Sequence, residues 1–168
     1  MRKSYLKKRF LALLIDYIVI WIYLILLFLL FAAIYILFFD SIPAFDETTS
    51  HLMSLFTTVL PATLVFSYME YRYPYQTFGK RRMGLEVTYE SRSYWHSLLR
   101  NGMKFLPWHI GHTGVIRAMY NDYSVLWFIV GNIGFLLAVI YILMVLFGKH
   151  FKHIPDMIAG TKVSEKGA

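Results

Sequence analysis

The sequence predicts an all-α membrane protein, a four-helix transmembrane bundle with a small cytoplasmic β element. Three observations predict this class. Hydrophobic residues make up 58% and aromatic residues 18% of the 168 positions, which is too apolar for an ordinary soluble domain. Residues 10–39 form an apolar run longer than the ~18 residues that indicate a membrane span. Basic residues gather before this run, as positive-inside topology requires. We therefore treat residues 1–168 as a single membrane domain.

The first predicted span, residues 10–39, carries one charged residue, Asp16. Basic residues without an acid precede it, and an acidic loop at residues 40–51 follows it, so we expect the N-terminus in the cytoplasm and the loop outside. Arg9 and Asp16 are seven residues apart and share a helix face. A carboxylate in a membrane helix is costly unless it is paired or faces protein or water. The rest of the chain must supply what Asp16 faces.

Three further spans are predicted at residues 52–71, 98–119 and 125–147. The first of them contains Pro61, where we expect a bend. Residues 98–119 are atypical because charged residues interrupt them, so they form either an amphipathic interfacial helix or a crossing packed against protein. The tail is basic, which favours the cytoplasm, and only an even number of crossings places both termini there. We therefore count residues 98–119 as the fourth span.

Residues 73–95 and 149–165 are expected to form a compact cytoplasmic cap. Within it, the central glycine-rich segment is predicted to be a hairpin, and residues 85–89 alternate apolar and polar side chains as a strand does. An isolated strand is not stable, so it needs a partner. We predict that residues 161–163 provide it.

Three separated stretches carry a family resemblance. They read Arg9-Phe10-Leu11-Ala12-x-x-x-Asp16, then Gln76-Thr77-x-Gly79-Lys80-Arg81-x-x-Gly84-Leu85-x-Val87 with Arg100 downstream, and then Asp156-x-x-Ala159-Gly160-Thr161-x-Val163. In this order they resemble the motifs of the RDD family of bacterial membrane proteins. The resemblance assigns the name-giving positions to Arg9, Asp16 and Asp156. Many members have a histidine directly before the last aspartate, whereas this chain has Pro155 there and His153 nearby.

The resemblance implies a multi-pass protein of the bacterial inner membrane. Some members have been assigned sodium (lithium, potassium)/proton antiport, which makes a monovalent cation/proton antiporter the specific activity implied. Asp16 and Asp156 would then bind a cation or a proton in turn, and basic neighbours would hold the carboxylates when the cation is absent. The candidate site consists of Arg9, Asp16, Lys80, Arg100 and Asp156, and the motif adds Gly79, Gly84, Gly160 and Thr161.

The same five residues also allow a structural interpretation. Bases that neutralise Asp16 and Asp156 would let both acids be buried, and the cluster would fasten the first span to the central segment and the tail. The chain would then be a non-transporting membrane scaffold or a lipid- or partner-interaction protein. The place of Asp16 near one end of its span favours this alternative, because transport carboxylates usually lie near the midplane.

Two interaction surfaces are candidates. Lys80, Arg81, Arg82 and Lys104 form a basic patch that either binds anionic lipid headgroups or merely fixes the topology. Gly131-x-x-Gly134 and Ala138 offer a close helix contact for a homodimer.

Several classes of function find no support in the sequence. The net charge of +7 follows membrane topology, so we expect no nucleic-acid partner. The glycines at residues 79 and 84 lack the Lys-Ser/Thr of a phosphate loop, and no nucleophile–base set stands out, so we expect no cofactor and no enzyme. The paired histidines at residues 109 and 112 and at 150 and 153 are interpreted as packing residues, and no metal is expected.

Overall fold

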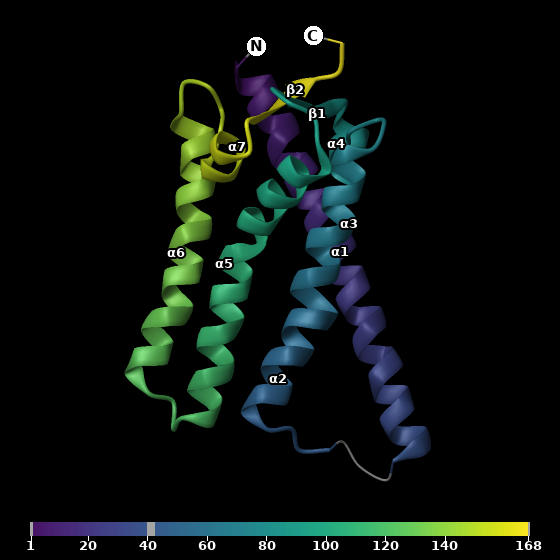
Figure 1. Cartoon of the computed structure of the whole chain (residues 1–168), viewed down its shortest axis with the longest axis vertical. Helices are drawn as coiled ribbons and strands as arrows, with labels where there is room; N and C mark the ends of the chain where they lie inside the picture. Colours follow the sequence, from purple (N-terminus) through teal and green to yellow (C-terminus); the bar gives the residue numbers. More distant parts are fainter. Residues whose placement is uncertain (1, 40–42, 168) are drawn as a thin grey trace.

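The computed structural model describes residues 2–39 and 43–167, and the chain is mostly helical with a small sheet at one end (Figure 1). In this described part, three stretches are long and apolar enough to cross a membrane: Lys3–Phe38, Glu47–Tyr71 and Val125–Phe147. The first is contained in α1 (Arg2–Phe38). The predicted spans 52–71 and 125–147 fall within the other two, whereas the start of the predicted acidic loop, residues 40–42, lies outside the described residues.

The second stretch consists of α2 (Glu47–Ser54), a π-helical turn η1 (Leu55–Val59) and α3 (Leu60–Tyr71). The π turn ends two residues before Pro61, where the sequence predicts a bend. Pro61 has no N–H to donate to the carbonyl of Thr57, four residues before it. The hydroxyl of Tyr23 on α1 donates to this oxygen instead, at 2.6 Å. The proline therefore frees a backbone acceptor that connects α1 to the second stretch.

The helix α5 (Tyr94–Tyr120) is longer than the predicted span 98–119 and continues through Pro107. Its N-terminus is set by Ser93, whose side chain accepts a hydrogen bond from the amide of His96. α5 and α6 (Val125–Phe147) lie side by side as an antiparallel pair joined by a short turn (Figure 1). α5 is not among the three stretches that are apolar enough to cross a membrane, so a four-helix transmembrane bundle does not follow from length and composition alone.

Glycines let the backbones of α5 and α6 meet. A Cβ atom on Gly114 would lie 2.3 Å from the backbone nitrogen of Gly131, and a Cβ on Gly134 would lie 2.5 Å from the carbonyl oxygen of Pro107. Small residues allow such close approach between membrane helices. Gly131 and Gly134 therefore pack against α5 of the same chain, so the close contact that the sequence offered for a homodimer is made within one chain.

The cap contains α4 (Phe78–Met83), β1 (Leu85–Tyr89), α7 (Ile154–Ile158) and β2 (Thr161–Glu165). β1 and β2 pair antiparallel from Leu85↔Glu165 to Tyr89↔Thr161, which confirms the predicted strand and its partner. The prediction of a central glycine-rich hairpin is wrong, since residues 78–83 form the helix α4. Thr77 caps its N-terminus, and Gly84 ends it in the left-handed conformation at φ 65°, which glycine adopts without strain.

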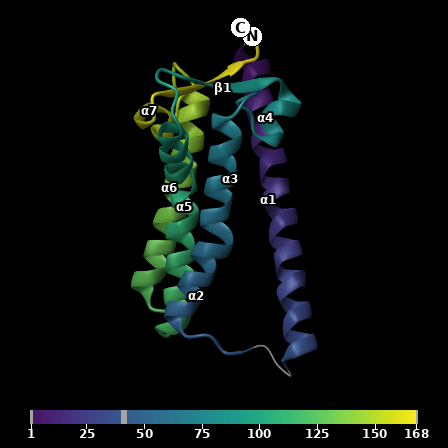
Figure 2. The same ribbon diagram turned by 45° about the vertical axis from the view of Figure 1, so that its right-hand side comes forward.

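α1 stands apart from the other long helices over much of its length (Figure 2). It packs mainly against α4, where Ala12 joins Leu85 and Val163 in a small apolar core beneath the sheet. Further along, Ile20 contacts a second core with Val59 and Phe66. The two termini lie at the same end of the molecule, beside the sheet (Figure 1).

Candidate functional site

Six charged residues are brought together where the long helices meet the cap. We call this set the clasp; it consists of the acids Asp16, Glu70 and Asp156 and the bases Arg9, Lys80 and Arg100. The three acids are 3%, 0% and 0% exposed. Because three acids meet three bases, the clasp is neutral, which makes the burial of so many charges tolerable. Five separate helices, α1, α3, α4, α5 and α7, contribute to it.

Asp16 on α1 is held by neutral donors. Its Oδ2 accepts a hydrogen bond from the hydroxyl of Thr77 at 2.6 Å, and its Oδ1 accepts one from the amide of Gly79 at 2.8 Å. Within the described residues, no basic side chain forms an ion pair with Asp16, and Arg9, which shares its helix face, bonds elsewhere. A carboxylate at the first turn of a helix is favoured by the exposed amides there. Asp16 therefore joins α1 to the start of α4.

Gly79 makes this contact possible. A Cβ atom at this position would lie 1.9 Å from the carbonyl oxygen of Ala12, so any side chain would push α4 away from α1. The family-motif glycine thus allows its own amide to reach Asp16.

Glu70, at the end of α3, is the centre of the clasp. Its Oε1 accepts a hydrogen bond from Lys80 Nζ at 2.7 Å, and its Oε2 accepts bonds from Arg100 Nη1 and, at 2.8 Å, from Asn101 Nδ2. Tyr89 donates to the backbone oxygen of the same residue. Glu70 is thus bonded to α4 and α5 through its side chain and to β1 through its backbone.

Sequence reasoning missed Glu70 as a site residue. A signal was available in the charge balance, because the predicted site contained three bases and only two acids. A neutral buried cluster needs a third acid. Glu70 is the only acidic residue in the predicted span 52–71, which made it the natural candidate.

Asp156, at the start of α7, closes the clasp on the cap side. Its Oδ1 accepts hydrogen bonds from Arg100 Nε at 2.8 Å and from the hydroxyl of Thr161 at 3.2 Å, and Arg9 approaches its Oδ2 at 3.8 Å. Burial alone would raise the pKa of Asp156, but the nearby cations, Arg100 first, lower it to about 2. Asp156 is therefore ionised at neutral pH.

His153 is a cap rather than a proton donor to Asp156. Its Nδ1 accepts a hydrogen bond from the amide of Asp156 at 3.1 Å, and Asp156 Oδ2 accepts a long one from the His153 amide at 3.5 Å. Burial is the main cause that lowers the pKa of His153 to about 4; the Asp156 carboxylate opposes this shift, and Arg100 and Arg9 add to it. The ring is therefore neutral and free to accept at neutral pH.

A continuous set of hydrogen bonds connects the two predicted carboxylates. Lys80 Nζ bonds both to Glu70 and, at 3.3 Å, to Thr77, which bonds to Asp16. Arg100 then links Glu70 to Asp156. All five residues of the predicted site thus lie in one cluster, but its two carboxylates are connected through other residues. The motif positions Gly84 and Gly160, both with positive φ, form turns in the cap, whereas Gly79 and Thr161 contact the clasp acids directly.

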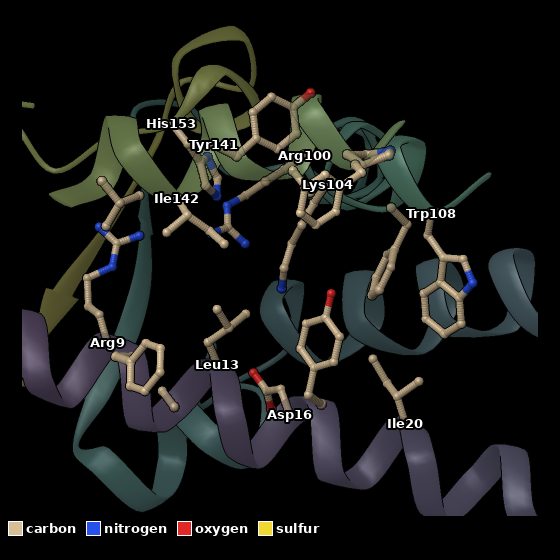
Figure 3. Close-up of a pocket in the computed structure, with 18 of the residues that line it drawn as sticks. Arg9, Leu13, Asp16, Ile20, Arg100, Lys104, Trp108, Tyr141, Ile142 and His153 are labelled. Atoms are coloured by element: carbon tan, nitrogen blue, oxygen red, sulfur yellow. The ribbon is translucent and has the colours of Figure 1, made fainter. Parts of the chain in front are cut away.

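A cavity of about 650 Å³ adjoins the clasp between α1, α5 and α6 (Figure 3). Its polar end is lined by Arg9, Asp16, Lys80, Arg100, Lys104 and His153. The remaining lining is largely apolar and includes Ile20, Leu24 and Trp108. Lys104 and Asp16 extend toward each other across it from α5 and α1 (Figure 3).

Lys104 differs from the other bases at this end. In the part of the chain that the structure describes, its ammonium makes neither an ion pair nor a hydrogen bond, and it lies 5.2 Å from the ring centroid of Phe66 and 5.6 Å from that of Phe105. The predicted basic patch is therefore not one surface. Arg81 and Arg82 are exposed on α4, Lys80 is buried against Glu70, and Lys104 lines the cavity.

Residues 4–160 match a family model described as the RDD family, and this stretch contains the whole clasp. No curated protein and no solved structure matches the chain.

Proposed function

The chain belongs to the RDD family, and from this premise we propose that it is a non-transporting scaffold of the bacterial inner membrane that interacts with lipid. In this proposal four helices cross the membrane, both termini lie in the cytoplasm, and the clasp locks the cap onto the membrane helices. No enzymatic activity is part of the proposal.

The main support for the proposal is that two of the three clasp acids, Glu70 and Asp156, are shielded from solvent. Glu70 and Asp156 are both fully buried, and Arg100 bonds to both of them. A carboxylate that exchanges a cation for a proton must be reached by water from each side of the membrane in turn. Arginine cannot give up its proton at any physiological pH, so each of its two carboxylate partners always faces a cation. This arrangement suits a fixed joint.

The four-crossing topology is supported by the position of α5. With 27 residues, α5 is about 40 Å long, which is more than the ~30 Å hydrocarbon thickness, and it runs beside the apolar helix α6. Both termini lie at the same end, which requires an even number of crossings (Figure 1). The basic N-terminal residues at that end favour the cytoplasm.

Topology can be tested with single cysteines, because the sequence contains none. We expect Asp122→Cys, in the exposed turn between α5 and α6, to react with a membrane-impermeant maleimide in intact spheroplasts. Lys166→Cys, beside the sheet, should react only after the membrane is opened. Protection of position 122 in intact spheroplasts would contradict the four-crossing arrangement.

One observation favours cation/proton antiport as a second candidate. Asp16 has no ion-pair partner among the described residues, and it lines a cavity opposite Lys104. An ammonium that competes with a cation for a carboxylate is the arrangement antiport requires. Antiport ranks second because both Asp16 oxygens already accept hydrogen bonds and the cavity is largely apolar, which offers few of the oxygen ligands that hard cations require.

Proton flux in proteoliposomes separates the two candidates. We expect no sodium-dependent dissipation of a pH gradient by the wild-type protein, and the same result for Asp16→Asn. A flux in the wild type that Asp16→Asn abolishes, while Asn132→Ala on the exposed side of α6 retains it, would replace the scaffold with an antiporter.

A further inference from the structure

The cavity beside the clasp carries one uncompensated positive charge. The clasp itself is neutral, and Lys104 adds a fourth base to three acids, which leaves a net charge of +1 at this end. The charges that act on its ammonium include Lys80 and Arg100, which repel it, and Glu70 and Asp16, which attract it. The acids are already bonded to other donors. An ammonium among apolar side chains needs a counter-ion, and within the described residues none is bonded to it.

The remainder of the cavity has the shape and chemistry of an acyl-chain groove. Its lining follows α1 from Asp16 to Leu24, eight residues or about 12 Å, and α5 from Lys104 to His112 over the same rise. One leaflet of a bilayer is about 15 Å deep, half of the hydrocarbon thickness. The volume of about 650 Å³ lies within the ~300–1,000 Å³ range of small-molecule sites. Aromatic and aliphatic side chains dominate this part, including Trp21, Phe105 and Trp108.

The groove is accessible from its sides, because lining residues on both of its flanks have exposed side chains. These are Tyr17 and Trp21 on α1 and Phe135 and Ile142 on α6. A ligand from the bilayer could therefore enter without passing the clasp. A free phosphate would leave the apolar part empty, and a second copy of the chain would need a buried acid to satisfy Lys104.

We propose that the groove binds one anionic phospholipid from the leaflet on the cap side, with its phosphate at Lys104 and an acyl chain between α1 and α6. This inference deepens the lipid interaction of the proposed function and rests on the membrane-spanning arrangement. It does not depend on the absence of transport. A monoanionic phosphodiester cancels the charge of +1, and a charge-assisted hydrogen bond to Lys104 fixes the headgroup.

Native mass spectrometry of the full chain in detergent tests this proposal. The probes are phosphatidylglycerol and phosphatidylcholine, added at equal concentrations. We expect one phosphatidylglycerol retained per chain and at least about tenfold weaker retention of phosphatidylcholine. The choline ammonium offsets the phosphate charge of phosphatidylcholine, whereas phosphatidylglycerol keeps a net negative charge that compensates Lys104. Lys104→Met should reduce the retention of phosphatidylglycerol by about tenfold or more. The matched control is Arg81→Met on the exposed side of α4, which should retain the lipid as the wild type does.

A second pair of variants tests the groove itself. Ala138→Phe places a ring into the lining on α6 and should displace the lipid, whereas Leu136→Phe on the exposed side of the same helix should not. Equal retention by Lys104→Met and the wild type would overturn the proposal, as would loss with Arg81→Met alone, which would place the lipid on the surface of α4. A dimer without bound lipid would also overturn it. Because sodium-dependent proton flux is measured in a separate assay, the non-transporting scaffold and the lipid-binding groove can each be contradicted while the other stands.

Discussion

α5 and α1 are joined to the rest of the molecule by opposite means. α5 meets α6 backbone to backbone, where Gly114 and Gly134 leave no room for a side chain. α1 is held chiefly at one end, through the Asp16 and Ala12 contacts with α4 and the approach of Arg9 to Asp156. The α5–α6 contact depends on close packing along the two helices. The attachment of α1 depends on charge and hydrogen bonds near one end of the helix. Close packing of uncharged backbone is insensitive to pH and salt. A buried ionic cluster, in contrast, loses stability when one of its charged partners is removed.

The largest effect is expected from removal of the central acid. Glu70→Leu leaves Lys80 and Arg100 buried beside one another without their shared partner, which costs about 3–5 kcal/mol. We expect loss of folded protein in membranes, or a large fall in the melting temperature in detergent. Glu90→Gln is the matched control, because Glu90 is 76% exposed and pairs loosely with Lys152.

Glu70→Leu combined with Lys80→Met should recover part of this loss, because one unpaired base is removed with the acid. A melting temperature of Glu70→Leu within a degree or two of the wild type would show that the clasp contributes little.

The second test compares the two contacts directly by adding one methyl group to each. Gly79→Ala would press a Cβ against the backbone of Ala12, and Gly134→Ala would do the same against Pro107 and Gly111. Each should cost about 3 kcal/mol, because the facing atoms are backbone and cannot turn aside. Hydrogen exchange should rise in α1 for the former and in α6 for the latter.

Gly102→Ala on α5 has open space and should be neutral or slightly stabilising. If Gly79→Ala and Gly134→Ala raise hydrogen exchange in the same helix, α1 and α6 are not attached independently of each other.

The pH dependence of the protein's stability should come from the clasp end of the molecule and not from the α5–α6 contact. The pKa of His153 is about 4 in the folded chain and about 6.5 in its usual range, so the unfolded chain binds a proton more readily between these values. Stability is then fully present above pH 6.5 and falls as the pH drops toward 4, by up to about 2 kcal/mol between pH 7 and 5. Asp156, with a pKa of about 2, adds its own loss only below about pH 4.

His153→Asn keeps a capping side chain without a titrating ring and should flatten the melting temperature between pH 7 and 5. His150→Asn, an exposed neighbour, should leave the slope unchanged. An unaltered slope with His153→Asn would assign the pH dependence to another group.

The smallest effect is expected from an ion pair of the same chemistry outside the clasp. Lys8 and Glu165 lie 2.9 Å apart, but their side chains are 39% and 40% exposed. Lys8→Gln should change the free energy of unfolding by less than about 1 kcal/mol, measured by thermal melting in detergent. A loss comparable with that of Glu70→Leu would mean that burial does not explain the strength of the clasp.

Local patterns in the sequence predicted the greater part of the fold. Apolar run length located the three stretches that can span a membrane, and the alternation at residues 85–89 identified β1 and its partner β2. The helix α4 was mistaken for a hairpin, because six residues are too short to show a helical period and Gly84 indicates a turn in either case.

The candidate site was predicted in membership but not in pairing. Arg9 shares a helix face with Asp16, yet it bonds to Asp156, which lies far along the chain. Sequence spacing determines neighbours on one helix only, whereas the hub role of Glu70 depends on how α3, α4 and α5 lie against each other. Gly131 and Gly134 likewise mark a close helix contact without indicating whether the partner is in the same chain.

The order of the clasp residues along the chain has a consequence for biogenesis. Asp156 is the last of the six to leave the ribosome, and every long helix precedes it. Until then the nascent protein holds three cations against two anions, so the joint cannot close. Membrane insertion of the long helices must therefore precede closure of the clasp. The C-terminal segment closes the clasp only when the rest of the chain has been made. Shortening the chain before residue 154 should therefore give inserted helices that remain open to membrane proteases.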